Sequence, residues 1–578
     1  MTKTLKSKET KDRNIQKLVI TELSSEEAMD FLMNTERYHD FELPEYFDFS
    51  EVLSFVRKKI KDKPYEECLA ESGASNFTDV NFDILLNKDG SYAVRPLVLC
   101  NPYLYYFLAR EICGKKNWEQ VKANFKECEV PRIKSCALPI VPAENESFHK
   151  STTILNWWSS IEQRSIELSL DYKYMFVTDI TNCYGSVNPQ SIDWALSRKG
   201  TKKETDENHE IASNIILLLK EMQQGRNIGI PQGSTLFDLT GEIVLCYSDL
   251  LLHEALGKAK IVDGYEILRY RDDYRVFCNS KDTLEKISYI LQQVLESLNF
   301  RMNSSKTKIC NSIVTDSVKP DKLHLIYNTP IRNKNGYAFD SLQKHLLYIL
   351  LFSREFPNSG QLRSLLSDFD KRVTEMLKPT VEINETLSLR VVSDGTLAFS
   401  SNELHEQKKS GWVRGNVRTL CAIATQIALE NVAVTHYALR TISLLTSGKH
   451  SLKLRSEIIP KVKNKLISIP NSTYSQLWLQ NMTYKYDKEK ALSPYEARLC
   501  KVVMGKNIDL WNNNWLKKEL TKGFPQKSAV NKKRLDELTP VITFREKFLY
   551  NEIEIDNIST ADELLDYFSQ MQEEGNAD

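Results

Sequence analysis

Two adjacent aspartates, Asp272 and Asp273, lie between apolar segments and have the clearest potential for chemistry in this sequence. Apolar dipeptides at 267–268 and 276–277 flank them, which predicts a strand on each side. A buried carboxylate is costly unless it is paired or binds a metal, and neighbouring carboxylates repel each other. Two strands joined by a short acidic turn would hold both side chains at one rim, as a divalent-metal site requires. A polar surface turn is the alternative explanation.

A third carboxylate for such a site is Asp179, which ends a hydrophobic stretch over residues 175–178. Phosphoryl transfer to an incoming nucleotide uses two divalent ions roughly 4 Å apart that carboxylates bridge, so an aspartate pair alone is too small a set. A strand ending in Asp179 would bring this side chain to the same sheet. The residues from Ile180 to Cys183 predict a sharp turn, and the aromatic ring of Tyr184 follows it.

The composition limits the class of protein. A chain of 578 residues predicts two or three domains, and a formal net charge of zero means that a nucleic-acid partner would need a local basic groove. The 11 cysteines are dispersed without a CxxC pair, which favours reduced thiols, and the 9 histidines complete no zinc pattern with them. The Lys-rich N-terminus lacks a signal-peptide core, and no stretch reaches the roughly 18 apolar residues of a spanning helix. We therefore expect a soluble, cytoplasmic protein without a membrane partner.

The hydrophobic pattern changes in kind at about residue 340. Before it, strand-like segments alternate with helical ones, whereas after it helical spacing of Leu, Ile and Val dominates. Short breaks separate these later helices, as in stacked helix pairs, although no fixed repeat length emerges. Basic residues between 517 and 534 precede an acidic segment after 547. A solvated tail would explain this change of charge, and so would an inter-subunit or intramolecular clasp between the two segments.

Four short motifs together resemble motifs A, B, C and D of a reverse transcriptase palm in order and spacing. They are Asp179 with Tyr184, then Pro231-Gln232-Gly233-Ser234, then Tyr270-Arg271-Asp272-Asp273, and then Asn303 to Lys306. The resemblance implies an α+β right-hand polymerase, in which an antiparallel palm sheet with helices forms fingers and palm.

Further segments resemble bacterial defence-associated reverse transcriptases, including the abortive-infection type. These segments are 95–97, 161–167, 179–187, 191–196 and 237–242. In that group an α-helical repeat domain follows the palm. The resemblance therefore implies a flexible charged N-terminus at 1–20, fingers and palm at 21–335, an α-helical C-terminal domain at 336–547 and an acidic tail at 548–578.

The resemblance also implies roles for the charged residues. Asp179 and Asp272, with the backbone of Ile180, would hold two Mg²⁺ ions, with Mn²⁺ as the alternative ion and Asp273 close by. Lys306 occupies the place of the motif D lysine that protonates the departing pyrophosphate, a general-acid role. An exposed lysine in a polar loop is the alternative for Lys306.

Nucleotide contacts are implied in the same way. Tyr184 would stand against the sugar 2′ position and disfavour ribonucleotides, although a core aromatic after a strand is the commoner fate of tyrosine. Gln232 and Gly233 would pack against the incoming nucleotide and template, glycine because only a bare backbone permits such an approach. Arg95 is our candidate for a fingers contact to the triphosphate, and Lys134 is a second one.

Two features depart from the usual pattern. Arg271 stands where many reverse transcriptases carry a small or apolar residue, so its cation could contact the primer strand or a phosphate, or form an ion pair. After residue 310 we recognise neither a primer-grip turn nor a thumb, which leaves the handling of the primer open.

Three functions are therefore compared. The first is an RNA-directed DNA polymerase in antiphage defence, which takes dNTPs and an RNA template or companion noncoding RNA, releases a DNA product, and acts alone or as a homo-oligomer. The second is template-independent or protein-primed DNA synthesis in abortive infection. The third is a catalytically idle palm that serves as a nucleic-acid-binding scaffold, against which the intact carboxylates argue.

Overall fold

The structure of the protein is a computed structural model. It describes residues 18–88, 93–141, 158–198, 201–328, 341–377, 401–447, 452–487 and 495–544, the short strands at 332–333 and 336–337, and Phe339. Most of the expected charged N-terminus and all of the expected acidic tail lie outside these residues. None of the described helices is both long enough and apolar enough to cross a membrane.

A five-stranded sheet lies at the centre of the first half of the chain, in the order β3-β5-β6-β4-β7. Strands β5 and β6 form the predicted hairpin, and β4 lies antiparallel to β6 and to β7, whereas β3 pairs with β5 in parallel. The strands are β3 (Ile133–Ser135), β4 (Tyr174–Asp179), β5 (Tyr265–Tyr270), β6 (Asp273–Cys278) and β7 (Lys308–Cys310).

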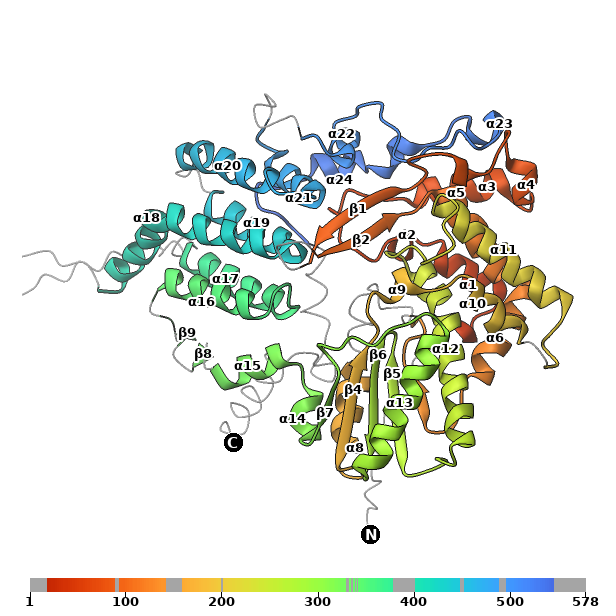
Figure 1. Cartoon of the computed structure of the whole chain (residues 1–578). Helices are drawn as coiled ribbons and strands as arrows, with labels where there is room; N and C mark the ends of the chain where they lie inside the picture. The colour runs from red at the N-terminus through yellow and green to blue at the C-terminus, as the bar shows by residue number, and fades with distance from the viewer. Residues whose placement is uncertain are drawn as a thin grey trace, which may run out of the picture.

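Helices cover both faces of this sheet (Figure 1). On one face, α13 packs on β4 and β6, and α12 packs on α13. On the other face, the side chains of Ile161, Leu168 and Ile313 form a separate apolar cluster with Met175 and Leu268. The covering elements are α12 (Thr235–Lys258), α13 (Lys281–Ser297), the π-helical turn η3 (Trp158–Gln163), α8 (Arg164–Leu168) and α14 (Ile313–Ser317).

Helix α12 is buried along most of its length. The Ser234 side chain caps it by accepting a hydrogen bond from the Phe237 amide, 3.3 Å away. Apolar side chains surround the helix, which is typical of a helix inside a large core. Its neighbour α13 is amphipathic instead, so one stripe faces the sheet and the rest faces solvent. Other helices near the sheet are α9 (Cys183–Ser186), α10 (Gln190–Ser197), α11 (Asp206–Met222) and α15 (Pro320–Asn328).

A helical layer and a long two-stranded hairpin precede the sheet in the sequence. The hairpin pairs β1 with β2 and lies above the sheet in Figure 1. Helix α5 begins with the Asn101 cap and Pro102 at its first turn, a favoured start because proline lacks an amide hydrogen to satisfy. These elements are α1 (Ser25–Leu32), α2 (Thr35–Tyr38), α3 (Ser50–Ile60), α4 (Tyr65–Cys68), β1 (Phe82–Asn87), β2 (Val94–Leu99), α5 (Pro102–Cys113) and α6 (Lys115–Glu127), with 3-10 turns η1 (Ile20–Glu22) and η2 (Ala74–Asn76).

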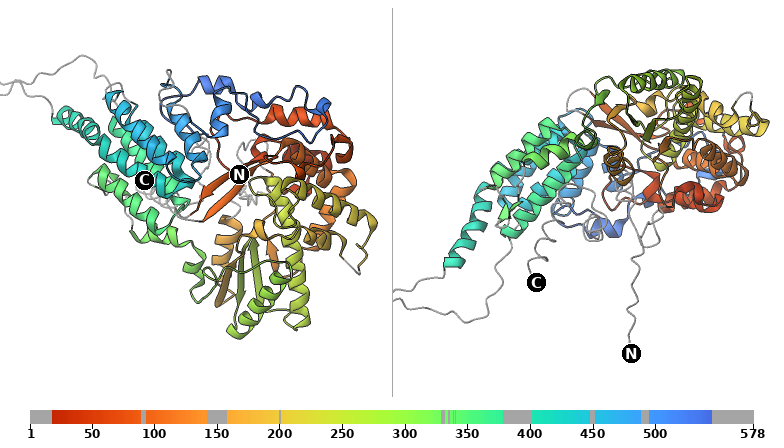
Figure 2. Two further views of the ribbon diagram at one scale, coloured as in Figure 1. Left: turned by 45° about the horizontal axis from the view of Figure 1, so that its top comes forward. Right: turned by 90° about the horizontal axis from the view of Figure 1, so that it is seen from below.

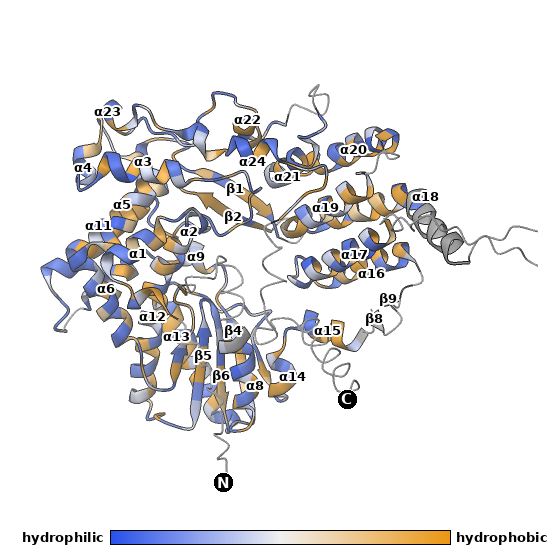
Figure 3. Cartoon of the chain, turned by 180° about the vertical axis from the view of Figure 1, so that it is seen from behind, coloured by the Kyte–Doolittle hydropathy of each residue, from blue (hydrophilic) through white to orange (hydrophobic). Residues whose placement is uncertain are grey.

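The second half of the chain is helical, as its spacing predicts, and projects to one side of the sheet (Figure 2). A small hairpin of β8 (Arg332–Asn333) and β9 (Gly336–Tyr337) leads into it. Several of its helices carry both apolar and polar stretches (Figure 3), as helices with one packed face do. The helices are α16 (Leu342–Glu355), α17 (Gln361–Leu377), α18 (Ser401–Glu430), α19 (Thr435–Leu445), α20 (Leu452–Ile467) and α21 (Thr473–Thr483), with the 3-10 turn η4 (Val432–Val434). The repeat character of this half stays a prediction.

Residues 495–544 return to the N-terminal layer. The Trp511 indole donates a hydrogen bond to the Leu99 carbonyl at 3.0 Å, and isolated bridges pair Leu69 with Leu516 and Phe47 with Val530. This last part of the expected C-terminal domain therefore packs with the expected fingers. Its elements are α22 (Arg498–Val503), α23 (Lys518–Thr521), η6 (Gln526–Ala529) and α24 (Lys532–Asp536).

Candidate active site

Asp179 and Asp273 lie side by side at one end of the sheet. Asp179 is the last residue of β4 and Asp273 the first of β6, and the two are direct partners in the antiparallel register. The Asp179 side chain is buried, with 5% of the residue exposed. Its Oδ2 atom pairs with the Lys306 ammonium, whereas Oδ1 has no hydrogen-bond partner. A buried carboxylate oxygen without a partner is costly and marks a position where a cation would be stabilised.

The third carboxylate belongs to the turn between β5 and β6. Tyr270 pairs with Asp273, so Arg271 and Asp272 are the two central residues of the turn. Arg271 has a φ of 54°, in the left-handed region that favours glycine, and such strain is frequent at functional sites. The Ile180 amide donates to the Asp272 carbonyl at 3.1 Å, which fixes the turn against the end of β4. The predicted acidic hairpin therefore brings all three aspartates to one edge.

The three carboxylates influence one another. Burial and the neighbouring Asp179 raise the pKa of Asp272, although Asp272 is only half-buried. Surrounding protein atoms and Asp272 raise the pKa of Asp273 to about 6, although its side chain reaches the surface. Mutual repulsion of this kind is relieved when a cation binds between the carboxylates.

These residues fit a divalent-metal site, although they do not enclose one as they stand. Among the described residues, no three His, Cys, Asp or Glu side chains converge tightly enough to hold a metal ion. The Lys306 ammonium already neutralises one oxygen of Asp179. The unpartnered Oδ1 atom of Asp179 and the acceptor-only chemistry of the three aspartates suit Mg²⁺, which prefers oxygen ligands.

Lys306 reaches the carboxylates from a turn before β7. The Asn303 amide donates to the Asp179 carbonyl at 2.8 Å, and the Lys306 amide closes the turn on the Asn303 carbonyl at 3.1 Å. The side chain is 61% exposed. Partial burial opposes its charge, but the hydrogen bond to Asp179 and the other two aspartates prevail and raise the pKa of Lys306. The lysine is therefore protonated at neutral pH and stands beside the carboxylates, as the predicted general acid requires.

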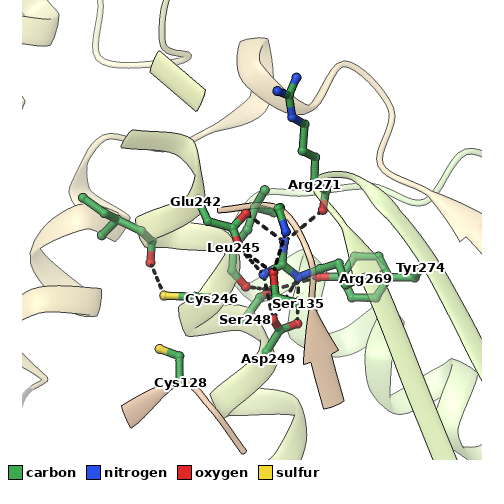
Figure 4. Close-up of polar contacts among 12 residues, drawn as sticks. Cys128, Ser135, Glu242, Leu245, Cys246, Ser248, Asp249, Arg269, Arg271 and Tyr274 are labelled. Atoms are coloured by element: carbon green, nitrogen blue, oxygen red, sulfur yellow. Dashed lines mark hydrogen bonds and ion pairs between the residues drawn. The ribbon is translucent and has the colours of Figure 1, made fainter. Parts of the chain in front are cut away.

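A buried ion-pair network supports the hairpin from behind (Figure 4). Arg269, the residue before Tyr270 on β5, is fully buried, and its Nη2 atom donates to Glu242 at 2.6 Å and to Asp249 at 2.7 Å. Both carboxylates belong to α12. The Nη1 atom of Arg269 also donates to the Arg271 carbonyl at 3.1 Å. The network thus ties the strained turn to the most buried helix of the fold.

In this structure Arg271 forms an ion pair with Asp238, which is one of the alternatives that the sequence left open. Its Nη2 atom donates to Oδ2 of Asp238 on α12 at 2.5 Å, and its guanidinium lies 5.7 Å from the centre of the Tyr270 ring. The other oxygen of Asp238 accepts a hydrogen bond from the Tyr184 hydroxyl. Burial raises the pKa of Asp238 to about 6, against the opposing effect of Arg271. Asp238 belongs to segment 237–242 of the sequence resemblance, which implied no role for it; an acidic residue inside a largely apolar helix, like Glu242 and Asp249, was the available signal.

The Gln232-Gly233 turn approaches protein backbone. The Gln232 carbonyl accepts from the Val98 amide of β2 at 2.8 Å. Gly233 has a φ of +124°, and a Cβ added there would lie 3.3 Å from both the nitrogen and the oxygen of Val98. Glycine is therefore required for close contact with β2 itself, and contact with a nucleotide stays a prediction.

Arg95 and Lys134 are not brought to the carboxylates by any described contact. Arg95 is exposed on β2, the same strand that holds the Gln232 turn, and Lys134 is exposed on β3. Strand β3 is separated from β4 by β5 and β6 in the sheet. The proposed triphosphate contacts of both residues therefore stay predictions.

Comparison with known proteins gives one family match. A model of the family described as reverse transcriptase (RNA-dependent DNA polymerase) matches residues 127–333, which contain all three aspartates, Tyr184, Gln232 and Lys306. The comparison with curated protein sequences finds no match.

Solved structures with some similarity include three structures of Candida telomerases. A truncated apo telomerase from Candida tropicalis has 14% identity and a TM-score of 0.27, and the match covers 46% of this chain and 56% of that one. The telomerase from Candida albicans in complex with a telomeric RNA fragment has 12% identity and a TM-score of 0.25, covering 71% and 67%. Apo telomerase from Candida tropicalis has 15% identity and a TM-score of 0.27, covering 78% and 72%.

Whole-chain superposition is poor at these scores, so the assignment depends on the family match and on the residues within it. The matched region spans the complete sheet from β3 to β7 and every residue of the predicted palm motifs. The chain contains a reverse transcriptase domain, the catalytic domain of an RNA-directed DNA polymerase.

Proposed function

We propose that this protein extends DNA from dNTPs by nucleotidyl transfer at Asp179, Asp272 and Asp273. The observation that supports this most directly is the unpartnered, buried Oδ1 atom of Asp179 beside two further carboxylates. A scaffold that only binds nucleic acid has no physical need for this arrangement, because phosphates are repelled by clustered carboxylates. The matched reverse transcriptase domain supports RNA as the template.

In this proposal the chain supplies ligands, orientation and a proton. Asp179, Asp272 and the Ile180 backbone would hold two Mg²⁺ ions, and Asp273 would adjust the charge beside them. Bound Mg²⁺ would activate the primer 3′-hydroxyl and neutralise the triphosphate. Lys306 would hold a proton on its Nζ atom for the departing pyrophosphate, and Tyr184 would face the sugar. The hydrogen bond from the Ile180 amide to Asp272 keeps the two halves of the carboxylate set in register.

The central test is primer extension on an RNA template with dNTPs and Mg²⁺. Asp272→Asn keeps the shape of the side chain and removes its charge, so we expect extension to fall below detection. Asp263→Asn is the matched control, because Asp263 is an exposed aspartate before β5 in the same region of the chain. Retained extension in Asp272→Asn, or equal loss in both variants, would contradict the proposed site.

A second candidate is synthesis without a template, or from a protein hydroxyl. The observation in its favour is that neither a primer-grip turn nor a thumb is recognised in the sequence after residue 310. Incubation with dNTPs and Mg²⁺ after nuclease treatment, without added nucleic acid, distinguishes the two. Polymer formed there, or product attached to the protein, favours the second candidate.

We also propose that the activity serves antiphage defence in the bacterial cytoplasm, with a companion noncoding RNA as the first partner to seek. The support is the sequence resemblance over segments 179–187, 191–196 and 237–242. Plaque counts on cells that express the wild type or Asp272→Asn provide the test. Protection that persists in the variant would favour the scaffold function, whereas protection lost with polymerase activity would support catalytic defence.

A further inference from the structure

Asp238 is the common hydrogen-bond partner of Tyr184, the proposed sugar contact, and of Arg271, the neighbour of Asp272. It lies in the first turn of α12 and is 8% exposed. One carboxylate oxygen accepts the Tyr184 hydroxyl hydrogen bond, and the other accepts from Arg271 at 2.5 Å. Neither contact is needed to fold α12, which Ser234 already caps. A buried carboxylate is costly, so its retention calls for a role other than packing.

The Tyr184 ring is fixed at three points. The Ile230 amide donates to the Tyr184 carbonyl at 2.8 Å, which anchors the main chain. The ring lies against Gly241, where an added Cβ would be 3.6 Å from the ring atom Cε1. Gly241 follows Asp238 by three residues on the same helix, so the two residues share a face. The hydroxyl is the third point, held by Asp238, and the ring therefore has one orientation.

Arg271 keeps the Asp238 carboxylate ionised. Desolvation favours the protonated acid at this depth, and the guanidinium opposes it. Asp40 and Glu242 are the other acidic groups that act on Asp238, and both repel its charge. Without Arg271 the carboxylate would be a weaker acceptor for the tyrosine hydroxyl. This accounts for arginine at a position where many reverse transcriptases carry a small or apolar residue.

We propose that Asp238 is a positioning residue for sugar selection, acting through the hydroxyl of Tyr184. This inference rests on the proposed polymerase function and on Tyr184 as the residue that faces the sugar. Because the hydroxyl donates to Asp238, it cannot donate to a ribonucleotide 2′-hydroxyl. That 2′-hydroxyl then receives no hydrogen bond from Tyr184 and meets a ring of fixed orientation, which disfavours ribonucleotides. Deoxynucleotides lack the group and are unaffected.

The test is a double-mutant cycle read as the ratio of kcat/KM for a dNTP to that for the matching rNTP. We expect Asp238→Ala to lower this ratio about tenfold or more, chiefly by improving rNTP use, because it releases the Tyr184 hydroxyl. In the Tyr184→Phe background the same change should have no further effect on the ratio. Asp238→Asn keeps only a neutral, weaker acceptor oxygen, so it should lower the ratio by less than Asp238→Ala does, and it covers the case in which Asp238→Ala does not fold.

Asp370→Asn is the matched control, because Asp370 on α17 is a buried carboxylate that also pairs with an arginine, Arg440, but lies in the helical half of the chain. Its ratio should equal that of the wild type. An Asp238→Ala effect of equal size on dNTP and rNTP, or one that persists in Tyr184→Phe, would overturn the inference. Absence of any dNTP incorporation by the wild type would instead refute the proposed function on which the inference rests.

Discussion

Lys306 pairs with Asp179 and would therefore compete with the proposed metal ions for this carboxylate. Its ammonium pairs with Oδ2 of the residue proposed to hold both ions. The raised pKa of Lys306, a result of these aspartates, keeps the group charged until a substrate with its own charge displaces it. Between catalytic cycles the lysine would thus stay paired with the carboxylates. During a cycle it would carry the proton for the departing pyrophosphate.

We therefore predict two opposite effects of Lys306→Gln. The value of kcat should fall on the order of 10² to 10⁴, the usual contribution of a general acid. The Mg²⁺ concentration that gives half-maximal rate should also fall, because a competing cation is gone. Lys308→Gln is the control, since Lys308 is similarly exposed but pairs with Asp316. An unchanged kcat, or a higher Mg²⁺ requirement, would contradict this role.

The residues proposed to take part in the chemistry were identified from the sequence, whereas their supporting residues were not. Asp179, Asp272 and Lys306 were identified because the order and spacing of their motifs resemble a reverse transcriptase palm, and their catalytic roles stay a prediction. Asp238 was missed because a carboxylate within an apolar helix has no identifiable partner until the rotation of that helix against the sheet is known. For the same reason Arg271 was left open between an ion pair and a phosphate contact, and the structure gives the ion pair.

At the scale of elements, the Gln232-Gly233 turn joins β2 to the sheet through backbone contacts. We predict that Gly233→Ala destabilises this junction and lowers the free energy of unfolding by about 1–3 kcal/mol, since the new Cβ meets Val98 at 3.3 Å and φ is positive. Gly264→Ala is the control, because Gly264 also has a positive φ, 75°, but faces open space. Denaturant unfolding of both variants separates the effect of contact between the new Cβ and Val98 from the effect of backbone strain. An equal loss in free energy of unfolding in the two variants would show that contact with β2 is unimportant.

The Arg269 network predicts a pH dependence of stability. Burial raises the pKa of Asp249 to about 6, whereas an unfolded aspartate titrates near 3.9. Between these values the folded state holds a proton that the unfolded state has released, so stability falls as pH rises from about 4 to 6. Asp249→Asn removes this titration. The stability of the variant relative to wild type should therefore rise by about 3 kcal/mol between pH 4 and pH 7.

Unfolding by urea at pH 4, 5.5 and 7 measures this difference. The loss of the hydrogen bonds to Arg269 changes the free energy of unfolding of the variant by the same amount at every pH. The prediction therefore concerns only how the difference between variant and wild type changes with pH. A difference that is flat, or that falls with pH, would show that Asp249 is ionised in the folded state over the whole window.

Long periodic elements were predicted well and short ones were not. The spacing of apolar residues predicts helices over 282–298 and 361–377, and α13 and α17 lie within a residue of these bounds, because each repeats its apolar positions over several turns. The three residues of β3 are too few to show a period, and their parallel pairing with β5 is a long-range contact. The sequence also predicts a helix over 152–170, and its described part, from residue 158, contains the π-helical turn η3 and α8.

At the scale of the whole molecule, residues 495–544 connect the end of the chain to the N-terminal layer. No sequence pattern predicts this connection, because the partners are more than four hundred positions apart, as for Trp511 and Leu99. Leu99 ends β2, and Val98 of the same strand holds the Gln232 carbonyl. A continuous path therefore runs from the Trp511 side chain through β2 to the Gln232-Gly233 turn.

Because of this path, substitution of Trp511 tests whether the C-terminal segment stabilises the N-terminal layer and β2. Its side chain is 1% exposed and its ring meets Phe49 and Phe524 edge-on, so Trp511→Ala should lower the free energy of unfolding by about 3–5 kcal/mol. Trp511→Phe keeps most of the packing but leaves the Leu99 carbonyl without its donor, at a cost of about 1–3 kcal/mol. Trp194→Ala, on the 40% exposed Trp194, is the control and should cost far less.

The same Trp511→Phe variant tests whether the C-terminal segment supports the nucleotide site through β2. If it does, KM for dNTPs should rise while circular dichroism shows that the fold persists. An unchanged KM would show that the segment contributes to stability alone.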